Sequence, residues 1–179
     1  MKYRIFAIPA LFSLLLALNS CIKDGNETSY KEWRMENTTF IEDAATERVD
    51  GILKYEKVIP DWDKSVYTLM QWHNDRSLTL PNGLRPLSNS TIDVKYLLTN
   101  IKGDTLDSSS SFRCKPNNLI TGFWVAVTNM QVGDSVTAII PHEAGYGSMG
   151  SGKVLPYSTL IFNIKLDSIV AFDSQPWRN

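Results

Sequence analysis

The chain has 179 residues, a formal net charge of −1 at pH 7 and 43% hydrophobic residues. This length suits one domain with an extension, and the near-neutral charge gives no support for nucleic-acid binding, which normally needs a basic patch. With two histidines and two cysteines, the sequence has no spaced Cys/His ligand set for a metal, and it also lacks a Gly-x-Ser-x-Gly nucleophile motif.

The first twenty residues have the features of a secretory signal. Lys2 and Arg4 form a basic start, and a short apolar stretch with small residues after it leads to Cys21. The apolar stretch is too short for a membrane-spanning helix, which needs about 20 residues. A cysteine directly after the cut is typical of a bacterial lipobox, so we expect Cys21 to carry lipid and to anchor the protein in the cell envelope. The outer membrane is the expected location, and a plain signal peptide with an incidental Cys21 is the alternative.

A helix is expected to follow a short polar tether. Ser29 and Glu32 have the spacing of a capping box, and Gly51 is the expected stop. Apolar residues recur on one face at helical spacing, namely Tyr30, Trp33, Phe40, Ile41 and Ala44. This face must pack either on the main domain, which we favour, or on a second copy of the chain as a homodimer.

Beyond residue 52 the pattern changes to strands. Residues 66–72 and 92–96 are rich in strand formers, and residues 160–167 alternate with period two, which places Phe162 on the buried face. Residues 122–130 are predicted to form a short helix that Gly133 ends. Several antiparallel strands around one short helix indicate an α+β fold.

Motifs in the second half of the chain occur in a definite order. They are Val94-Lys95-Tyr96, Gly103 to Ser109, Leu119 to Phe123, Met130 to Asp134, Gly145-Tyr146-Gly147, Leu155-Pro156 and Thr159 to Phe162. None of them is specific alone. Together they resemble an FKBP-type peptidyl-prolyl isomerase, in order and at nearly the family spacing. The resemblance implies a curved antiparallel sheet half-wrapped around a short helix. The expected divisions are a lipoprotein signal peptide (1–20), a tether with an N-terminal helical extension (21–63), the isomerase domain (64–171) and a tail (172–179).

The resemblance also implies a site for Xaa-Pro segments of client proteins, with no cofactor and no metal. The expected catalytic residues are Tyr96, Asp107, Ile120, Phe123, Tyr146 and Phe162, and the expected substrate-binding residues are Leu106, Phe112, Leu119, Val154 and Leu155. The Tyr146 hydroxyl and the Ile120 backbone N–H would each hold a substrate carbonyl. Asp107 would accept a hydrogen bond at the rim, and residues 147–155, here named the flap, would cover the pocket.

Several positions depart from the family pattern. Phe123 stands where the family usually has Trp, and Leu106 stands where it usually has Phe. The loop at 110–117 is expected to be shorter than usual, so the aromatic group that the family often has there is either missing or supplied by Phe112. These departures keep open an alternative function, that of a catalytically weak or inactive FKBP-fold chaperone or binding lipoprotein.

Two further patterns need a separate interpretation. Residues 145–150 match Gly-x-Gly-x-x-Gly, but Pro141 precedes them and Pro156 follows, so the required strand and helix cannot flank them and no nucleotide site is expected. Trp124 lies at an outward position of the short helix. We expect it to pack against the N-terminal helix, the alternative being a partner surface.

Overall fold

The computed structural model describes residues 30–76 and 83–172. The expected signal, Cys21 and the tether lie outside these residues. The described elements are α2 (Lys31–Thr46), β1 (Arg48–Val49), β2 (Ile52–Leu53), β3 (Glu56–Val58), β4 (Thr68–Trp72), β5 (Thr91–Thr99), β6 (Thr105–Cys114), η2 (Pro116–Asn118), α3 (Thr121–Asn129), β7 (Ser135–Ile140), η3 (His142–Ala144) and β8 (Leu160–Ala171). The predicted α+β class, with an N-terminal helix before the sheet, is confirmed. Neither α2 nor α3 is long and apolar enough to cross a membrane.

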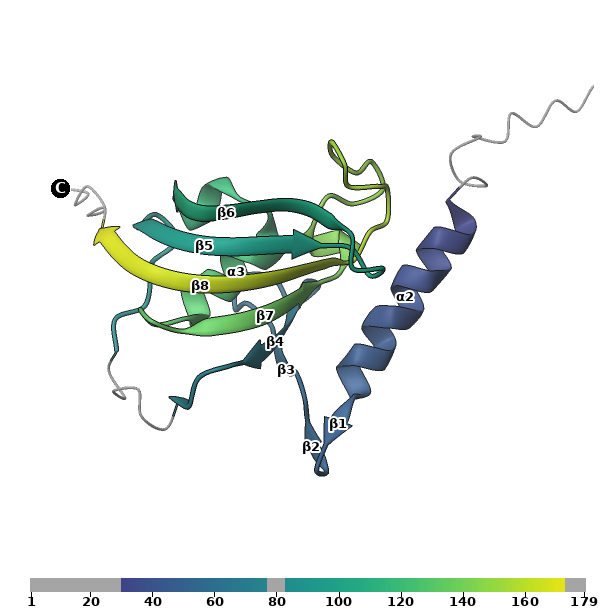
Figure 1. The fold of residues 1–179 in the computed structure, drawn as a ribbon, viewed down its shortest axis with the longest axis horizontal. Helices are drawn as coiled ribbons and strands as arrows, with labels where there is room; N and C mark the ends of the chain where they lie inside the picture. Colours follow the sequence, from purple (N-terminus) through teal and green to yellow (C-terminus); the bar gives the residue numbers. More distant parts are fainter. Residues whose placement is uncertain (1–29, 77–82, 173–179) are drawn as a thin grey trace, which may run out of the picture.

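Six antiparallel strands form the main sheet in the order β3-β4-β7-β8-β5-β6. Figure 1 shows the sheet curving in front of α3, with α2 beside it. On β8 the alternating residues Leu160, Phe162, Ile164 and Leu166 are buried in the main core, as their period of two predicts. The core therefore lies between the concave face of the sheet and α3.

The N-terminal helix differs from the prediction at its end. The structure has Tyr30 at the N-cap without a side-chain cap bond, while the predicted start at Ser29 lies outside the described residues. The helix ends at Thr46, not at Gly51. Asp50 and Gly51 both have positive φ, 52° and 80°, and they form the turn of the β1–β2 hairpin. An Asp-Gly pair is a favoured hairpin turn, because both of its residues tolerate this conformation.

The helix α2 packs on its own domain. Ile41 and Ala44 join a second apolar cluster with Tyr55, Leu69 and Ile139. Leu69 and Ile139 are cross-strand partners on β4 and β7. Their neighbours along each strand belong to the main core, and successive side chains point to opposite faces of a sheet. Ile41 and α3 therefore lie against opposite faces, which agrees with the favoured intramolecular packing.

This arrangement explains why the expectation for Trp124 was wrong. Trp124 stacks on Trp62, with ring centroids 4.7 Å apart and planes 19° from parallel. Trp62 lies in the segment between β3 and β4. Because α3 and Ile41 of α2 pack on opposite faces of the sheet, the sheet separates Trp124 from that part of α2.

The loop predicted at 110–117 is mostly strand. Strand β6 continues through Cys114, so only the residues after it turn, through η2. The serines at 108–111 belong to this strand as well. The strand lies at the edge of the sheet, where polar side chains face water and discourage pairing with another chain. Because of this polar composition, the sequence predicted a loop where the structure has a strand.

Candidate active site

A pocket of about 280 Å³ opens between β5, β6, β8, the start of α3 and the segment before the flap. Its walls are formed by Tyr96, Leu98, Asp107, Phe112, Leu119, Ile120, Phe123, Tyr146 and Phe162. The structure thus brings together all of the predicted catalytic residues, and Leu119 and Phe112 from the predicted substrate-binding set. Their roles in catalysis stay predictions.

Three of the predicted substrate-binding residues do not line this pocket. Leu106 packs against the main core, and Val154 is itself buried in that core. Leu155 is 46% exposed. Leu98 lines the pocket but was not among the predicted site residues. Leu98 lies two positions after Tyr96 on β5, and this spacing places both side chains on one face of a strand.

Aromatic rings form the interior of the pocket. Tyr96 makes an edge contact with Phe112 at 5.6 Å and another with Phe123 at 6.1 Å between ring centroids. Phe162 lies 5.1 Å from Phe123 and 5.9 Å from Tyr96. Edge-to-face pairs at these separations are the favoured geometry for aromatic side chains, so the rings support one another. The result is a preformed apolar floor.

A polar pair lies at the rim. The Tyr96 hydroxyl donates a hydrogen bond of 2.6 Å to Asp107 Oδ2, and the Ser108 backbone N–H donates one of 2.8 Å to Asp107 Oδ1. Burial is the largest cause and the hydrogen bond to Asp107 the next, and together they raise the pKa of Tyr96 to about 12. Tyr96 is therefore a neutral donor at physiological pH, and Asp107 is held by both oxygens.

This pair predicts a separate tyrosine titration. The folded-state pKa of Tyr96 lies near 12 and its ordinary value is 10.0, so its stabilising contribution is complete below pH 10 and is lost as the pH rises towards 12. We expect tyrosinate absorbance to show a tyrosine that titrates near pH 12, and Asp107→Asn should shift this titration to lower pH. Burial is the larger cause, so the shift should be partial. Titration of Tyr96 at its ordinary value in the wild type would contradict this environment.

Two residues of the pocket lining can donate hydrogen bonds, Ile120 through its backbone N–H and Tyr146 through its hydroxyl. Ile120 is the N-cap of α3, and its N–H has no acceptor among the described residues. The start of a helix carries partial positive charge and favours an oxygen acceptor. Tyr146 lines the same pocket and is 37% exposed, so its hydroxyl is accessible. The pocket can therefore receive carbonyl oxygens beside an apolar ring.

The flap contains glycines with left-handed backbone. Gly150 has a φ of +69°, and a Cβ built there would lie 2.3 Å from the carbonyl oxygen of Val154. Gly152 has a φ of +55° but no atom within 4 Å of such a Cβ. A side chain at either position would strain the backbone because φ is positive, but only at Gly150 would it also clash with another atom.

These glycines form a matched test of the flap. We expect Gly150→Ala to lower kcat/KM for an Xaa-Pro peptide by about tenfold, because the flap backbone must move to relieve the clash, whereas Gly152→Ala should cost less than about threefold. Steady-state assays of both variants, with their melting temperatures, check this. Equal losses would show that the Gly150 contact does not shape the pocket.

The pocket fits chemistry in which no covalent bond breaks. Rotation about an amide faces a barrier of about 18–20 kcal/mol because of its resonance. A site that removes water from the carbonyl disfavours the charge-separated resonance form, and fixed donors can then bind the twisted amide more tightly than the planar one. Aromatic walls, two available donors and a polar rim are the groups that this mechanism needs.

Comparisons with known proteins identify similar sequences and a similar fold. Residues 83–167 match the family model of the FKBP-type peptidyl-prolyl cis-trans isomerase. The chain is 33% identical over 109 residues to FK506-binding protein 4 of Dictyostelium discoideum, which covers 58% of this chain and 30% of that protein. It is 28% identical over 144 residues to the peptidyl-prolyl cis-trans isomerase FKBP15-3 of Arabidopsis thaliana, covering 77% of this chain and 96% of that protein.

A solved structure extends the similarity to the fold. FkpA from Escherichia coli superposes with a TM-score of 0.64 at 21% identity, over 80% of this chain and 62% of that chain. The match covers 80% of this chain, which is more than residues 83–179 can account for, so it includes part of the chain before the family match. From the family match, we conclude that residues 83–167 form a domain of the FKBP-type peptidyl-prolyl cis-trans isomerase family.

Proposed function

We propose that this protein is a lipid-anchored prolyl isomerase that assists the folding of proteins outside the cytoplasm. The observation that carries the catalytic part is the convergence of the aromatic floor, the Tyr96–Asp107 pair and the two donors at Ile120 and Tyr146 on one pocket. Its substrates would be Xaa-Pro segments of client proteins. The isomerase domain would occupy residues 64–171, after the tether and extension at 21–63 and before the tail at 172–179.

In the proposed mechanism the proline ring lies against Phe123 and Phe162. The Tyr146 hydroxyl and the Ile120 N–H donate to substrate carbonyls, which fixes one side of the amide while the other side rotates. Asp107 holds the Tyr96 hydroxyl and contributes negative potential at the rim. The apolar walls keep water from the rotating carbonyl, and the twisted amide is thereby favoured over the planar one.

The rim provides the direct test of this mechanism. We expect Asp107→Ala to lower kcat/KM by about tenfold, the equivalent of about 1.4 kcal/mol of transition-state stabilisation. Asp107→Asn keeps an acceptor for Tyr96 and should lose less. Exchange spectroscopy by NMR on an Xaa-Pro peptide measures both. Full activity in Asp107→Ala would remove the carboxylate from the mechanism.

The proposed anchor rests on the sequence around Cys21, whose thiol would carry the lipid. Incorporation of a labelled fatty acid, followed by separation of the membranes, tests this. The wild-type chain should carry label and sediment with the outer membrane, and Cys21→Ser should do neither. Membrane association of an unlabelled wild-type chain would contradict the lipid anchor, and a labelled chain in the inner membrane would contradict the location.

Self-association through α2 is the remaining proposed partner interaction. The outward side of the helix carries Met35, which is 63% exposed, and a groove lies between this side and the β5–β6 turn at Ile101 and Lys102. A second copy would dock here, since the inward side of α2 is already packed on the domain. Sedimentation equilibrium should then show a dimer that Met35→Glu weakens. A monomer at all concentrations would contradict it.

A second candidate function is that of a binding module or chaperone without turnover. The stacked indoles of Trp62 and Trp124 favour it, because Trp62 is 54% exposed and could contact apolar segments of unfolded proteins. An aggregation assay separates the two functions. Protection that survives Phe162→Ala but falls with Trp62→Ala would identify this second surface.

A further inference from the structure

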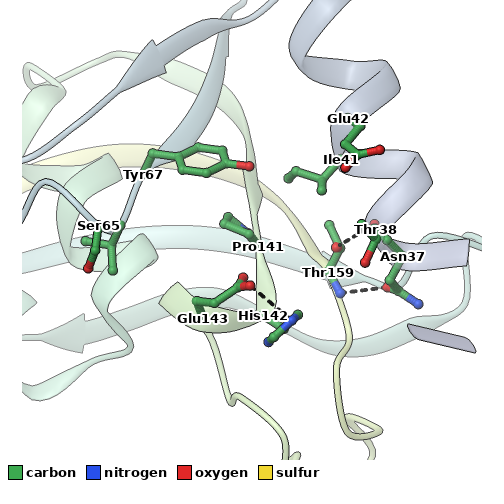
Figure 2. A pocket seen from close by; sticks show the side chains of 11 residues that line it. Asn37, Thr38, Ile41, Glu42, Ser65, Tyr67, Pro141, His142, Glu143 and Thr159 are labelled. Atoms are coloured by element: carbon green, nitrogen blue, oxygen red, sulfur yellow. Dashed lines mark hydrogen bonds and ion pairs between the residues drawn. The ribbon is translucent and has the colours of Figure 1, made fainter. Parts of the chain in front are cut away.

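The helix α2 is joined to the segment that follows the flap by a buried side chain. Asn37 is 1% exposed. Its Oδ1 accepts a hydrogen bond of 2.6 Å from the Thr159 N–H, and its carbonyl oxygen accepts one of 3.2 Å from Thr159 Oγ1 (Figure 2). Its Nδ2 donates to the Trp33 carbonyl oxygen at 2.8 Å. Both ends of the amide are thus satisfied, one by the helix and one by the segment after the flap.

The same turn of α2 contacts the two residues before Thr159. Trp33 Nε1 donates to Ser158 Oγ at 3.1 Å, and Ser158 Oγ donates in turn to the Leu155 carbonyl oxygen at 2.7 Å. The Arg34 guanidinium lies 4.6 Å from the centre of the Tyr157 ring. Three consecutive residues are therefore held by one helical turn.

These residues are connected to Tyr146 in the pocket. The Tyr157 N–H donates to the Gly147 carbonyl oxygen at 2.9 Å, and Gly147 directly follows Tyr146. The Gly150 N–H donates to the Tyr146 carbonyl oxygen at 3.2 Å. Tyr157 has a φ of +60°, a conformation that a non-glycine residue keeps only where its surroundings hold it. The contacts with α2 supply such surroundings.

Polar contacts, more than apolar packing, fix this part of the interface. The buried apolar contacts of α2 with the sheet lie further along the helix, at Ile41 and Ala44. A cavity of about 250 Å³ lies at the same interface, and its walls include Asn37, Ile41, Pro141, His142 and Thr159 (Figure 2). Because the packing here is incomplete, the hydrogen bonds of Asn37 and Trp33 determine where the end of the flap lies.

We propose that α2 positions the flap and Tyr146 for catalysis, with Asn37 and Trp33 as positioning residues. Neither residue lines the pocket. They act on it through the segment 157–159 and its hydrogen bond to Gly147. The inference rests on the proposed isomerase function, since it assigns a role in turnover to a helix outside residues 83–167, the span of the family match.

A double-mutant cycle tests the coupling. We expect Asn37→Ala to lower kcat by about fivefold with a smaller change in KM, because Tyr146 loses its position. In the Tyr146→Phe background the same change should cost less than about twofold, because the hydroxyl that it positions is absent. Equal losses in both backgrounds would overturn the proposal, since a loss of stability alone affects both alike.

A second variant at the interface and a control variant on α3 accompany the double-mutant cycle. Trp33→Phe removes the Nε1–H donor together with part of the ring and should give a smaller loss with the same dependence on Tyr146. Asn129→Ala is the matched control on α3. Asn129 Nδ2 also donates to the carbonyl oxygen four residues earlier, Val125, at 2.8 Å, and the side chain makes no hydrogen bond to the flap among the described residues. It should leave kcat unchanged. A loss in Asn129→Ala as large as in Asn37→Ala would overturn the assignment.

Amide hydrogen exchange measures the positioning without turnover. Asn37→Ala should raise the exchange rate of the Tyr157 amide by about tenfold or more and leave the amides of β7 unchanged, because local opening of the flap no longer has to break the contact with α2. If the Tyr157 amide of Asn37→Ala exchanges at the wild-type rate and the variant is fully active, the positioning role of Asn37 is overturned, while the proposed isomerase function stands. A wild-type chain without isomerase activity would overturn the proposed function and the catalytic role of α2 together.

Discussion

Replacing Phe162 by alanine is expected to remove most of the isomerase activity. Phe162 is 5% exposed and contacts both Phe123 and Tyr96, so its loss opens the aromatic floor and admits water to the rotating amide. We expect kcat/KM to fall by about 100-fold, the equivalent of about 2.7 kcal/mol. NMR exchange spectroscopy on an Xaa-Pro peptide measures this fall.

The same substitution will cost stability, so a control must separate the two effects. A buried Phe→Ala change costs about 3–5 kcal/mol. Ile164 lies two positions further along β8, is equally buried and does not line the pocket. Ile164→Ala should destabilise the fold by about 2–5 kcal/mol but keep nearly full kcat/KM at a temperature where the chain is folded. Equal activity losses in both variants would show that the assay reports stability alone.

The second large effect is expected at the interface between α2 and the sheet. Leu69 is fully buried and belongs to the cluster that holds Ile41. Leu69→Ala should lower the free energy of unfolding by about 2–5 kcal/mol. Because the two side chains belong to one cluster, the effects of Leu69→Ala and Ile41→Ala should be non-additive by about 0.5–3 kcal/mol. Denaturant unfolding of the two single variants and the double variant measures the coupling.

Met70 supplies the matched control for this cycle. It is the next residue of β4, is also fully buried and faces the main core on the other side of the sheet. Met70→Ala should destabilise the protein by a similar amount without coupling to Ile41→Ala. Additive effects of Leu69→Ala and Ile41→Ala would mean that α2 is not docked on β4 in solution.

The features that the sequence predicted correctly are those with a regular apolar period. The alternation along β8 placed Phe162 inward, and the family motifs named most of the residues that line the pocket, together with three that do not. Both signals are local or depend on order along the chain, so they can be detected without coordinates. Leu98 carried the same signal, two residues after Tyr96, and was missed because it belongs to none of the motifs that carry the family resemblance.

The features that the sequence did not predict depend on competition between local and tertiary structure. Gly51 is compatible with the end of a helix and with the turn of a hairpin. Asp50 beside it also has a positive φ, and two such residues in a row are typical of a hairpin turn. The serines of β6 favour a loop by composition, but pairing along β5 makes them a strand. The contact of Trp124 with Trp62 joins segments far apart in sequence, for which no periodic signal exists.

The structure shows what the residues that depart from the family pattern contact. Phe123 completes the floor by packing on Phe162, and Phe112 supplies a ring on the Tyr96 side of the pocket. Leu106 packs against the core and does not line the pocket, so a leucine there need not impair substrate binding. These observations favour an active enzyme over a module that has lost turnover.

The most direct test is the cis–trans exchange of Xaa-Pro peptides, measured by NMR with the purified full-length chain. The series should vary the residue before proline, because the flap is expected to set that preference. We expect acceleration that falls in Phe162→Ala and Asp107→Ala and persists in Ile164→Ala. No acceleration across the series, from a chain whose near-UV circular dichroism shows native aromatic packing, would contradict it and leave a binding module on an isomerase fold.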